Sequence, residues 1–143
     1  MFKRIMVPIE TKSKSEKAMQ IAYKLADIHQ SEIILFNVIR TKALDAIEDI
    51  SKIEREEQRK QLEEDSYKML IHIKKSLPDS RMKVFIDIVE GEPASKITEV
   101  AKKNKVDLII MPKTGKIGPR RVLLGDVSIK VVESTDIPVM LVA

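Results

Sequence analysis

The residues best suited to chemistry lie in one stretch, between Pro112 and Lys130. Gly115 and Gly125 are separated there by nine residues. Five basic side chains accompany a single acidic one, so the stretch has a net charge of +4, equal to that of the whole chain. Glycine lets the backbone approach a ligand closely, and free N–H groups at the start of a following helix attract anions. The stretch therefore predicts a phosphate-binding loop whose basic side chains also contact the anion; a solvated surface loop is the alternative. The side chains concerned are Lys113, Lys116, Arg120 and Arg121.

Residues that would support catalysis are scarce. The chain has no cysteine, and its two histidines, His29 and His72, fall on different predicted helices without metal-ligand spacing. Ser128 lies outside a Gly-x-Ser-x-Gly motif, and no Walker lysine motif is present. We expect a binding protein without enzymatic activity, no catalytic residues and no metal site, with a slow ATPase as an alternative. A phospho-receiver is a weaker alternative, because Glu10 stands alone after the first predicted strand.

The elements that must position this loop alternate between strands and helices. Apolar runs predict strands at residues 5–9, 32–39, 82–89, 106–111 and 139–143. The intervening segments predict helices at about 13–29, 44–77, 93–104 and 126–134. Such alternation predicts an α/β fold with a parallel sheet covered by helices on both faces, and the length suits a single domain over residues 1–143.

Several residues predict where the helices begin. Ser13 and Glu16 have the spacing of a capping box for the first helix, and Pro93 suits the first turn of the third. Asp126 is a good residue to cap the last helix with its own side chain. In the second helix, acidic and basic residues alternate every four positions from Glu48 to Lys68, which indicates a solvated surface more than a partner-binding face. Residues 54–61 include no apolar side chain, so this part is expected to stand clear of the core.

In doubly wound sheets the ligand lies beyond the carboxyl ends of the strands where the winding reverses. The two loops best furnished for this are the one after the first strand, which begins at Glu10, and residues 112–125 after the fourth. We expect these loops to meet over a small crevice that accepts an anion.

The second of these loops resembles the phosphate-binding loop of the universal stress protein family. The family pattern is Gly, two residues, Gly, nine residues, then Gly followed by Ser or Thr, and Pro112, Gly115, Gly125 and Asp126 occupy its four named positions. Residues 15–19, 91–94, 107–111 and 137–142 match further family segments in order, so the resemblance covers nearly the whole chain. It implies a three-layer, doubly wound five-stranded parallel sheet with strand order 3-2-1-4-5, the adenine-nucleotide α-hydrolase-like fold.

The resemblance also implies a site for ATP or AMP. Glu10 and Val38 would flank the base, and Met111, Pro112 and Gly115 would contact the ribose and α-phosphate. The outer phosphates would meet Gly125, Asp126, Val127 and Ser128.

Three departures from the family pattern bear on that site. Pro112 has no N–H to donate, the Asp126 carboxylate repels phosphate, and Glu10 replaces a shorter Asp. We therefore expect a non-enzymatic stress-response regulator with an altered or weakened adenine-nucleotide site. A competent ATP- or AMP-binding protein that acts as a nucleotide-dependent switch is the alternative.

Composition and the chain end bear on partners and location. Aromatic residues are only 3% of the chain and none lies in the basic stretch, which argues against a nucleic-acid partner. With no cysteine, no signal peptide and no long apolar run, we expect a cytoplasmic protein without a membrane partner. The apolar last strand is expected to form a homodimer contact, as in family members. The 34% of charged residues suggests a thermophilic source. A further protein partner is expected, but the sequence does not identify it.

Overall fold

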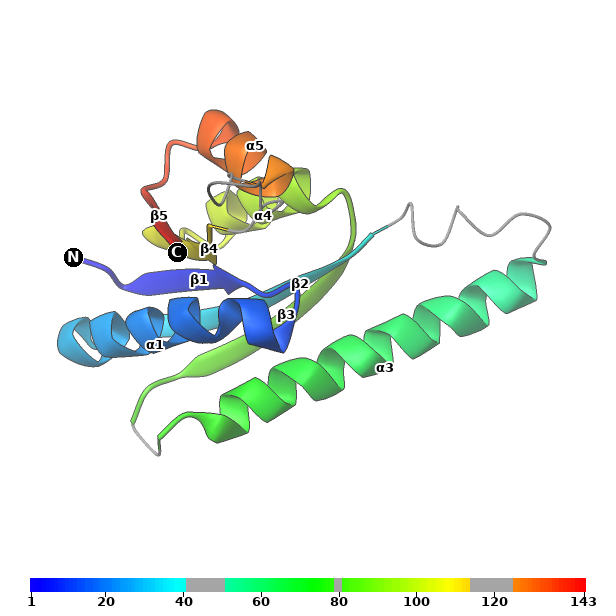
Figure 1. Cartoon of the computed structure of the whole chain (residues 1–143), viewed down its shortest axis with the longest axis horizontal. Helices are drawn as coiled ribbons and strands as arrows, with labels where there is room; N and C mark the ends of the chain where they lie inside the picture. The colour runs from blue at the N-terminus through cyan, green and yellow to red at the C-terminus, as the bar shows by residue number, and fades with distance from the viewer. Residues whose placement is uncertain (41–50, 79–80, 114–124) are drawn as a thin grey trace, which may run out of the picture.

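The computed structural model describes residues 1–40, 51–78, 81–113 and 125–143. Strands and helices alternate along these ranges, which confirms the predicted pattern (Figure 1). The elements are β1 (Arg4–Pro8), α1 (Lys12–His29), β2 (Glu32–Arg40), α3 (Lys52–Ser76), β3 (Val84–Gly91), α4 (Pro93–Lys103), β4 (Leu108–Pro112), α5 (Asp126–Ser134) and β5 (Val139–Val142).

The strands form one parallel sheet in the order β3-β2-β1-β4-β5, which confirms the predicted fold class and strand order. β1 is central and pairs with β2 on one side and with β4 on the other. The chain winds from β1 out to β3 and then returns to β4 and β5 on the opposite side. The winding therefore reverses between β1 and β4, as a ligand site in a doubly wound sheet requires.

Two apolar clusters cover the two faces of this sheet. On one face, strand residues such as Ile5 and Leu35 pack with α1 and with Leu70 of α3. On the other face, Met6 and Phe36 pack with α4 and α5. Figure 1 shows the same three layers, with α1 and α3 on one side of the strands and α4 and α5 on the other. β1 contributes to both clusters because alternate side chains of a strand point to opposite faces.

The first helix begins earlier than its predicted capping box. Thr11 is the N-cap, and its side chain accepts a hydrogen bond from the Lys14 N–H. Ser13 therefore lies inside the helix, and Ser15 is buried with its hydroxyl donating to the Thr11 carbonyl. The prediction of a Ser13–Glu16 box was wrong because Thr11 offers an equivalent oxygen two residues upstream.

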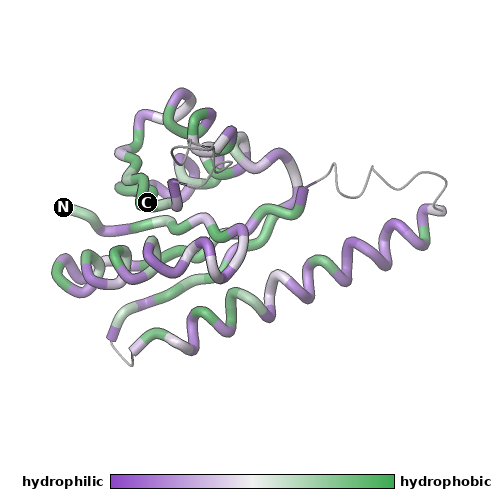
Figure 2. The backbone as a smooth tube through the Cα atoms, in the orientation of Figure 1, coloured by the Kyte–Doolittle hydropathy of each residue, from purple (hydrophilic) through white to green (hydrophobic). Residues whose placement is uncertain are grey.

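The long helix α3 extends well past the sheet. Residues 44–50 of the predicted helix lie outside the described ranges, and α3 begins with a capping box formed by Ser51 and Glu54. Its buried residues are Ser66, Leu70 and Ile73, all in the second half. The first half is mainly hydrophilic and reaches beyond the strands (Figures 1 and 2), so the expectation that residues 54–61 stand clear of the core is confirmed.

Candidate functional site

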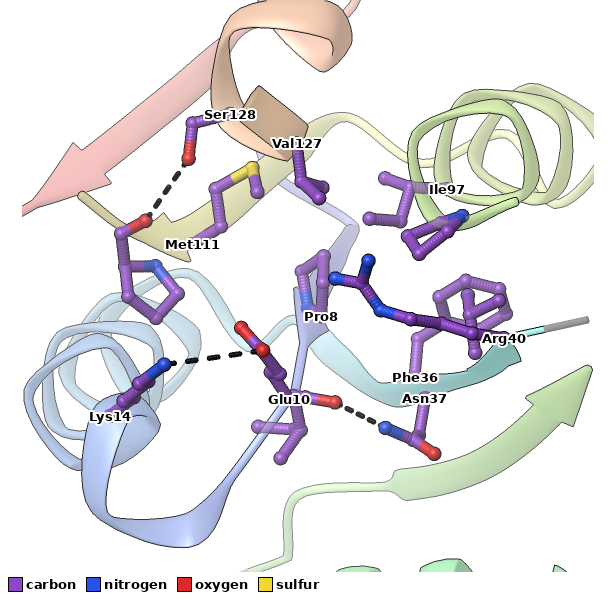
Figure 3. A pocket seen from close by; sticks show the side chains of 14 residues that line it. Pro8, Glu10, Lys14, Phe36, Asn37, Arg40, Ile97, Met111, Val127 and Ser128 are labelled. Carbon is purple, nitrogen blue, oxygen red and sulfur yellow. Dashed lines mark hydrogen bonds and ion pairs between the residues drawn. The ribbon is translucent and has the colours of Figure 1, made fainter. Parts of the chain in front are cut away.

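The candidate site is a pocket at the carboxyl ends of β1, β2 and β4, where the winding reverses. Its walls come from the ends of these strands and from the first turns of α4 and α5 (Figure 3). The lining residues are Pro8, Ile9, Glu10, Lys14, Phe36, Asn37, Val38, Arg40, Pro93, Ile97, Met111, Pro112, Val127 and Ser128.

Six of the nine predicted site residues meet in this pocket: Glu10, Val38, Met111, Pro112, Val127 and Ser128. Gly125 and Asp126 lie next to it, as the N-cap and first residue of α5, but do not line it. Gly115 lies outside the described ranges, as do Lys116, Arg120 and Arg121. The expected meeting of the two loops is therefore seen for the described part of each loop, while the binding roles of these residues remain predictions.

Hydrogen bonds hold the turn after β1 in place. The Ile9 N–H donates to the Phe36 carbonyl at 2.7 Å, and the Asn37 amide donates to the Ile9 carbonyl at 2.5 Å. Asn37 in turn accepts from the hydroxyl of Ser66 on α3 at 2.6 Å. The carboxylate of Glu10 projects from this turn and lies 4.0 Å from the Lys14 ammonium. Both side chains are about half exposed, so this pair contributes little stability and leaves Glu10 accessible to a ligand.

The other side of the pocket is the start of α5. Gly125 is the N-cap and makes no side-chain capping bond, so Asp126 does not cap the helix as predicted but occupies its first turn. The Ser128 hydroxyl is buried and donates to the Pro112 carbonyl at 3.3 Å. Ser128 is thus already engaged, whereas the first N–H groups of α5 lack a side-chain acceptor among the described residues.

Sequence reasoning missed three polar residues of the pocket: Lys14, Asn37 and Arg40. Asn37 interrupts an apolar strand, and Arg40 ends it. A polar residue near the carboxyl end of a buried parallel strand is the signal that could have indicated both. Lys14 has no comparable signal, because it reads as an ordinary solvent-facing residue of the first helix.

The described ranges give no support for two other kinds of site. They hold no group of three or more His, Asp or Glu side chains arranged to bind a metal ion. Among the helices they include, none is long and apolar enough to cross a membrane.

A parallel sheet with a pocket at its winding reversal defines the class of doubly wound α/β folds, which bind ligands at this position. The family profile of the universal stress protein family matches residues 1–143, and the chain belongs to that family. The universal stress protein MJ0531 of Methanocaldococcus jannaschii is 30% identical over 148 residues, covering 99% of this chain and 82% of that protein. The solved structure of MJ0577, from the same organism, has a TM-score of 0.85 at 30% identity and covers 99% of this chain and 96% of its own.

Two more distant structures contain nucleotides. A universal stress protein in complex with cAMP has a TM-score of 0.68 at 17% identity, covering 99% of this chain and 96% of that one. A universal stress protein from Archaeoglobus fulgidus in complex with dAMP has a TM-score of 0.67 at 14% identity, covering 99% and 98%. At these identities the likeness concerns the fold.

Proposed function

We propose that this chain is a non-enzymatic, cytoplasmic regulator that binds an adenine nucleotide in the pocket between β1 and β4, with a weakened phosphate end. The observation that carries the proposal is the convergence of Glu10, Val38 and Met111 on one pocket beside the start of α5. The cAMP and dAMP complexes of more distant family members support the choice of an adenine nucleotide.

At the nucleoside end of the pocket the walls are mostly apolar, from Pro8, Phe36, Ile97 and Met111, and suit the flat face of a base. Glu10 lies at the edge and can accept a hydrogen bond from an exocyclic amine.

The phosphate end is less favourable. The uncapped start of α5 attracts an anion, but the exposed Asp126 carboxylate adds a negative charge in the same helical turn. Pro112 has no N–H, and the Ser128 hydroxyl is held by the Pro112 carbonyl. Each additional phosphate therefore gains little, so AMP is expected to bind at least as tightly as ATP.

Calorimetry with AMP and ATP, with and without Mg²⁺, tests this proposal. We expect Asp126→Ser to raise the ATP affinity about threefold or more relative to AMP, because the repulsion between Asp126 and the outer phosphates is removed. The matched control is Asp136→Ser, which removes an exposed carboxylate between α5 and β5. No binding of either nucleotide would overturn the proposal. Micromolar binding of ATP by the unchanged chain would instead favour a competent nucleotide switch.

The absence of turnover is tested separately by phosphate release from ATP. We expect no release above background. Release that Asp126→Ala and Gly115→Val both abolish would establish a slow ATPase.

We further propose a homodimer through β5. This strand lies at the edge of the sheet, and it and α5 expose the apolar side chains Ile129, Val132 and Met140. Exposed apolar side chains at a strand edge favour pairing with another chain. Light scattering at micromolar concentration should give twice the chain mass, and Met140→Lys should give the monomer. A monomeric unchanged chain would contradict the proposal.

A further inference from the structure

Arg40 is a pocket cation that, like Lys14, has no role in the family pattern described above. It is the last residue of β2, and its side chain is exposed. Phe36, Val38 and Arg40 alternate along β2 and so point to the same face of the sheet, toward the pocket. Figure 3 shows the Arg40 side chain running from the strand end toward Pro8 and Val127.

The other polar side chains of the pocket already have partners. Asn37 is held between Ser66 and the Ile9 carbonyl, and Ser128 donates to the Pro112 carbonyl. Glu10 and Lys14 lie 4.0 Å apart. Arg40, in contrast, makes no hydrogen bond or ion pair with the residues that the structure describes. Its guanidinium is therefore available to a ligand.

The surroundings of Arg40 favour a flat ligand over a point charge. The neighbouring wall is apolar, formed by Pro8, Ile97 and Val127. An Arg guanidinium is planar, weakly hydrated and stacks on aromatic faces, which a Lys ammonium does not. A base lying on this wall would be covered on its outer side by the guanidinium plane.

We infer that Arg40 stacks on the nucleobase of the bound ligand and is a specificity-determining residue that favours a purine over a pyrimidine. A purine offers the guanidinium a larger π-face than a pyrimidine does. This inference rests on the proposed function, since it concerns the base of the same nucleotide.

The test compares ligands with and without phosphate. Calorimetry with adenosine, AMP and CMP is done on the unchanged chain and on Arg40→Ala and Arg40→Lys, with Arg81→Ala as the control. Arg81 is exposed and lies just before β3, at the amino-terminal end of the sheet and away from the pocket. Thermal unfolding of each variant verifies that it is folded.

Stacking predicts that Arg40→Ala lowers the affinity for adenosine and for AMP by the same factor, roughly tenfold. Arg40→Lys should lose most of the same affinity, because it keeps the charge but not the plane. The preference for AMP over CMP should shrink in both variants, and Arg81→Ala should bind like the unchanged chain.

Three results would overturn this inference while leaving the proposed function intact. They are unchanged AMP binding by Arg40→Ala, a loss confined to AMP with adenosine unaffected, and full affinity in Arg40→Lys. The last two would assign Arg40 to the phosphate or to charge alone. If the unchanged chain binds neither adenosine nor AMP, both the proposed function and this inference fail.

Discussion

Gly91, at the end of β3, has a backbone conformation that other residues rarely adopt. Its φ is +154°, and a Cβ atom there would lie 2.7 Å from Cε and 2.8 Å from Cγ of Lys96. Gly91 pairs with Arg40 of β2 and directly precedes Glu92, the N-cap of α4. Its backbone conformation therefore sets the direction of the chain from β3 into α4.

Gly91→Ala is therefore expected to lower the free energy of unfolding by about 1–3 kcal/mol. Urea denaturation of Gly91→Ala measures this. Two causes contribute to this loss: the strained φ of residue 91 and the close contact with the Lys96 side chain. Gly91→Ala in a Lys96→Ala background separates them, because Lys96→Ala removes the side-chain contact but not the backbone strain. A Gly91→Ala protein as stable as the unchanged chain would show that the backbone relaxes without cost.

Glu92 caps α4 through its side chain. It accepts hydrogen bonds from the Ser95 N–H at 2.8 Å and the Ala94 N–H at 3.3 Å. The Ser95 N–H is the main cause that lowers the pKa of the Glu92 carboxyl below its ordinary 4.5, with help from the Ser95 hydroxyl, Ala94 and the nearby Lys130. The ionised form is thus the one that the fold stabilises.

A pKa lowered on folding gives stability that is present above the unfolded pKa and is lost as the pH falls through the folded pKa. Glu92→Gln should therefore reduce stability at pH 7, by about 0.5–1 kcal/mol. The difference should shrink as the pH falls below 4.5, the ordinary value. Chemical denaturation between neutral and acidic pH measures it, with the exposed Glu99→Gln as control. A difference that persists unchanged in acid would contradict the assignment.

At the residue scale, the family resemblance predicted six residues of the pocket and missed those outside the family's site. Val127 and Ser128 were implied by the family pattern that the glycine spacing matches, and Glu10 and Val38 by the family's site for the base. Arg40 and Asn37 are polar residues near the end of a buried strand, but this local signal does not show that β2 lies beside β1 at the pocket, so both were missed. The prediction that Asp126 caps α5 was wrong, because Gly125 is the N-cap.

At the scale of elements, Asn37 connects α3 to the turn that carries Glu10. The Ser66 hydroxyl donates to Asn37, and Asn37 donates to the Ile9 carbonyl. Ser66 is the buried polar residue of α3, one helical turn before the buried Leu70. This pair of hydrogen bonds therefore ties the helix to the turn after β1, on the face of the sheet opposite to Phe36 and Val38.

Asn37→Ala removes both bonds and leaves two part-buried groups without a partner. We expect a loss of about 1–3 kcal/mol in unfolding free energy and weaker AMP binding, because the Glu10 turn loses its support. Ser66→Ala removes only one bond and should cost less in both measurements. Equal effects of the two substitutions, or none, would show that the connection does not hold the turn.

The elements themselves differed in how well the sequence predicted them. Strands β1 to β4 were found because a buried parallel strand requires a continuous apolar run. The start of α1 was misplaced because Thr11 and Ser13 are both good caps, and only the packing of Ser15 distinguishes them. The alternating charges of α3 predicted a helix but not which part of it packs on the sheet; that depends on the few apolar residues after Ser66.

At the scale of the whole molecule, the strand order followed from the family resemblance, whereas the alternation of predicted strands and helices gave only the α/β class with a parallel sheet. The charged surface leads to a separate prediction. With 34% charged residues and no cysteine, the chain is expected to melt above about 60 °C in calorimetry. Raising the salt concentration should lower the melting temperature if surface ion pairs such as Arg4–Glu32 contribute. Melting below about 60 °C would contradict a thermophilic origin.

The amino-terminal half of α3 projects beyond the core of the sheet, but one ion pair fastens it to a strand. The Nε atom of Arg59 lies 2.9 Å from the Glu90 carboxylate of β3. Beyond Arg59 the helix extends only about 10 Å to Lys52, at about 1.5 Å per residue. The charged tip of α3 must therefore follow any displacement of β3, the strand that pairs with β2 beside the pocket.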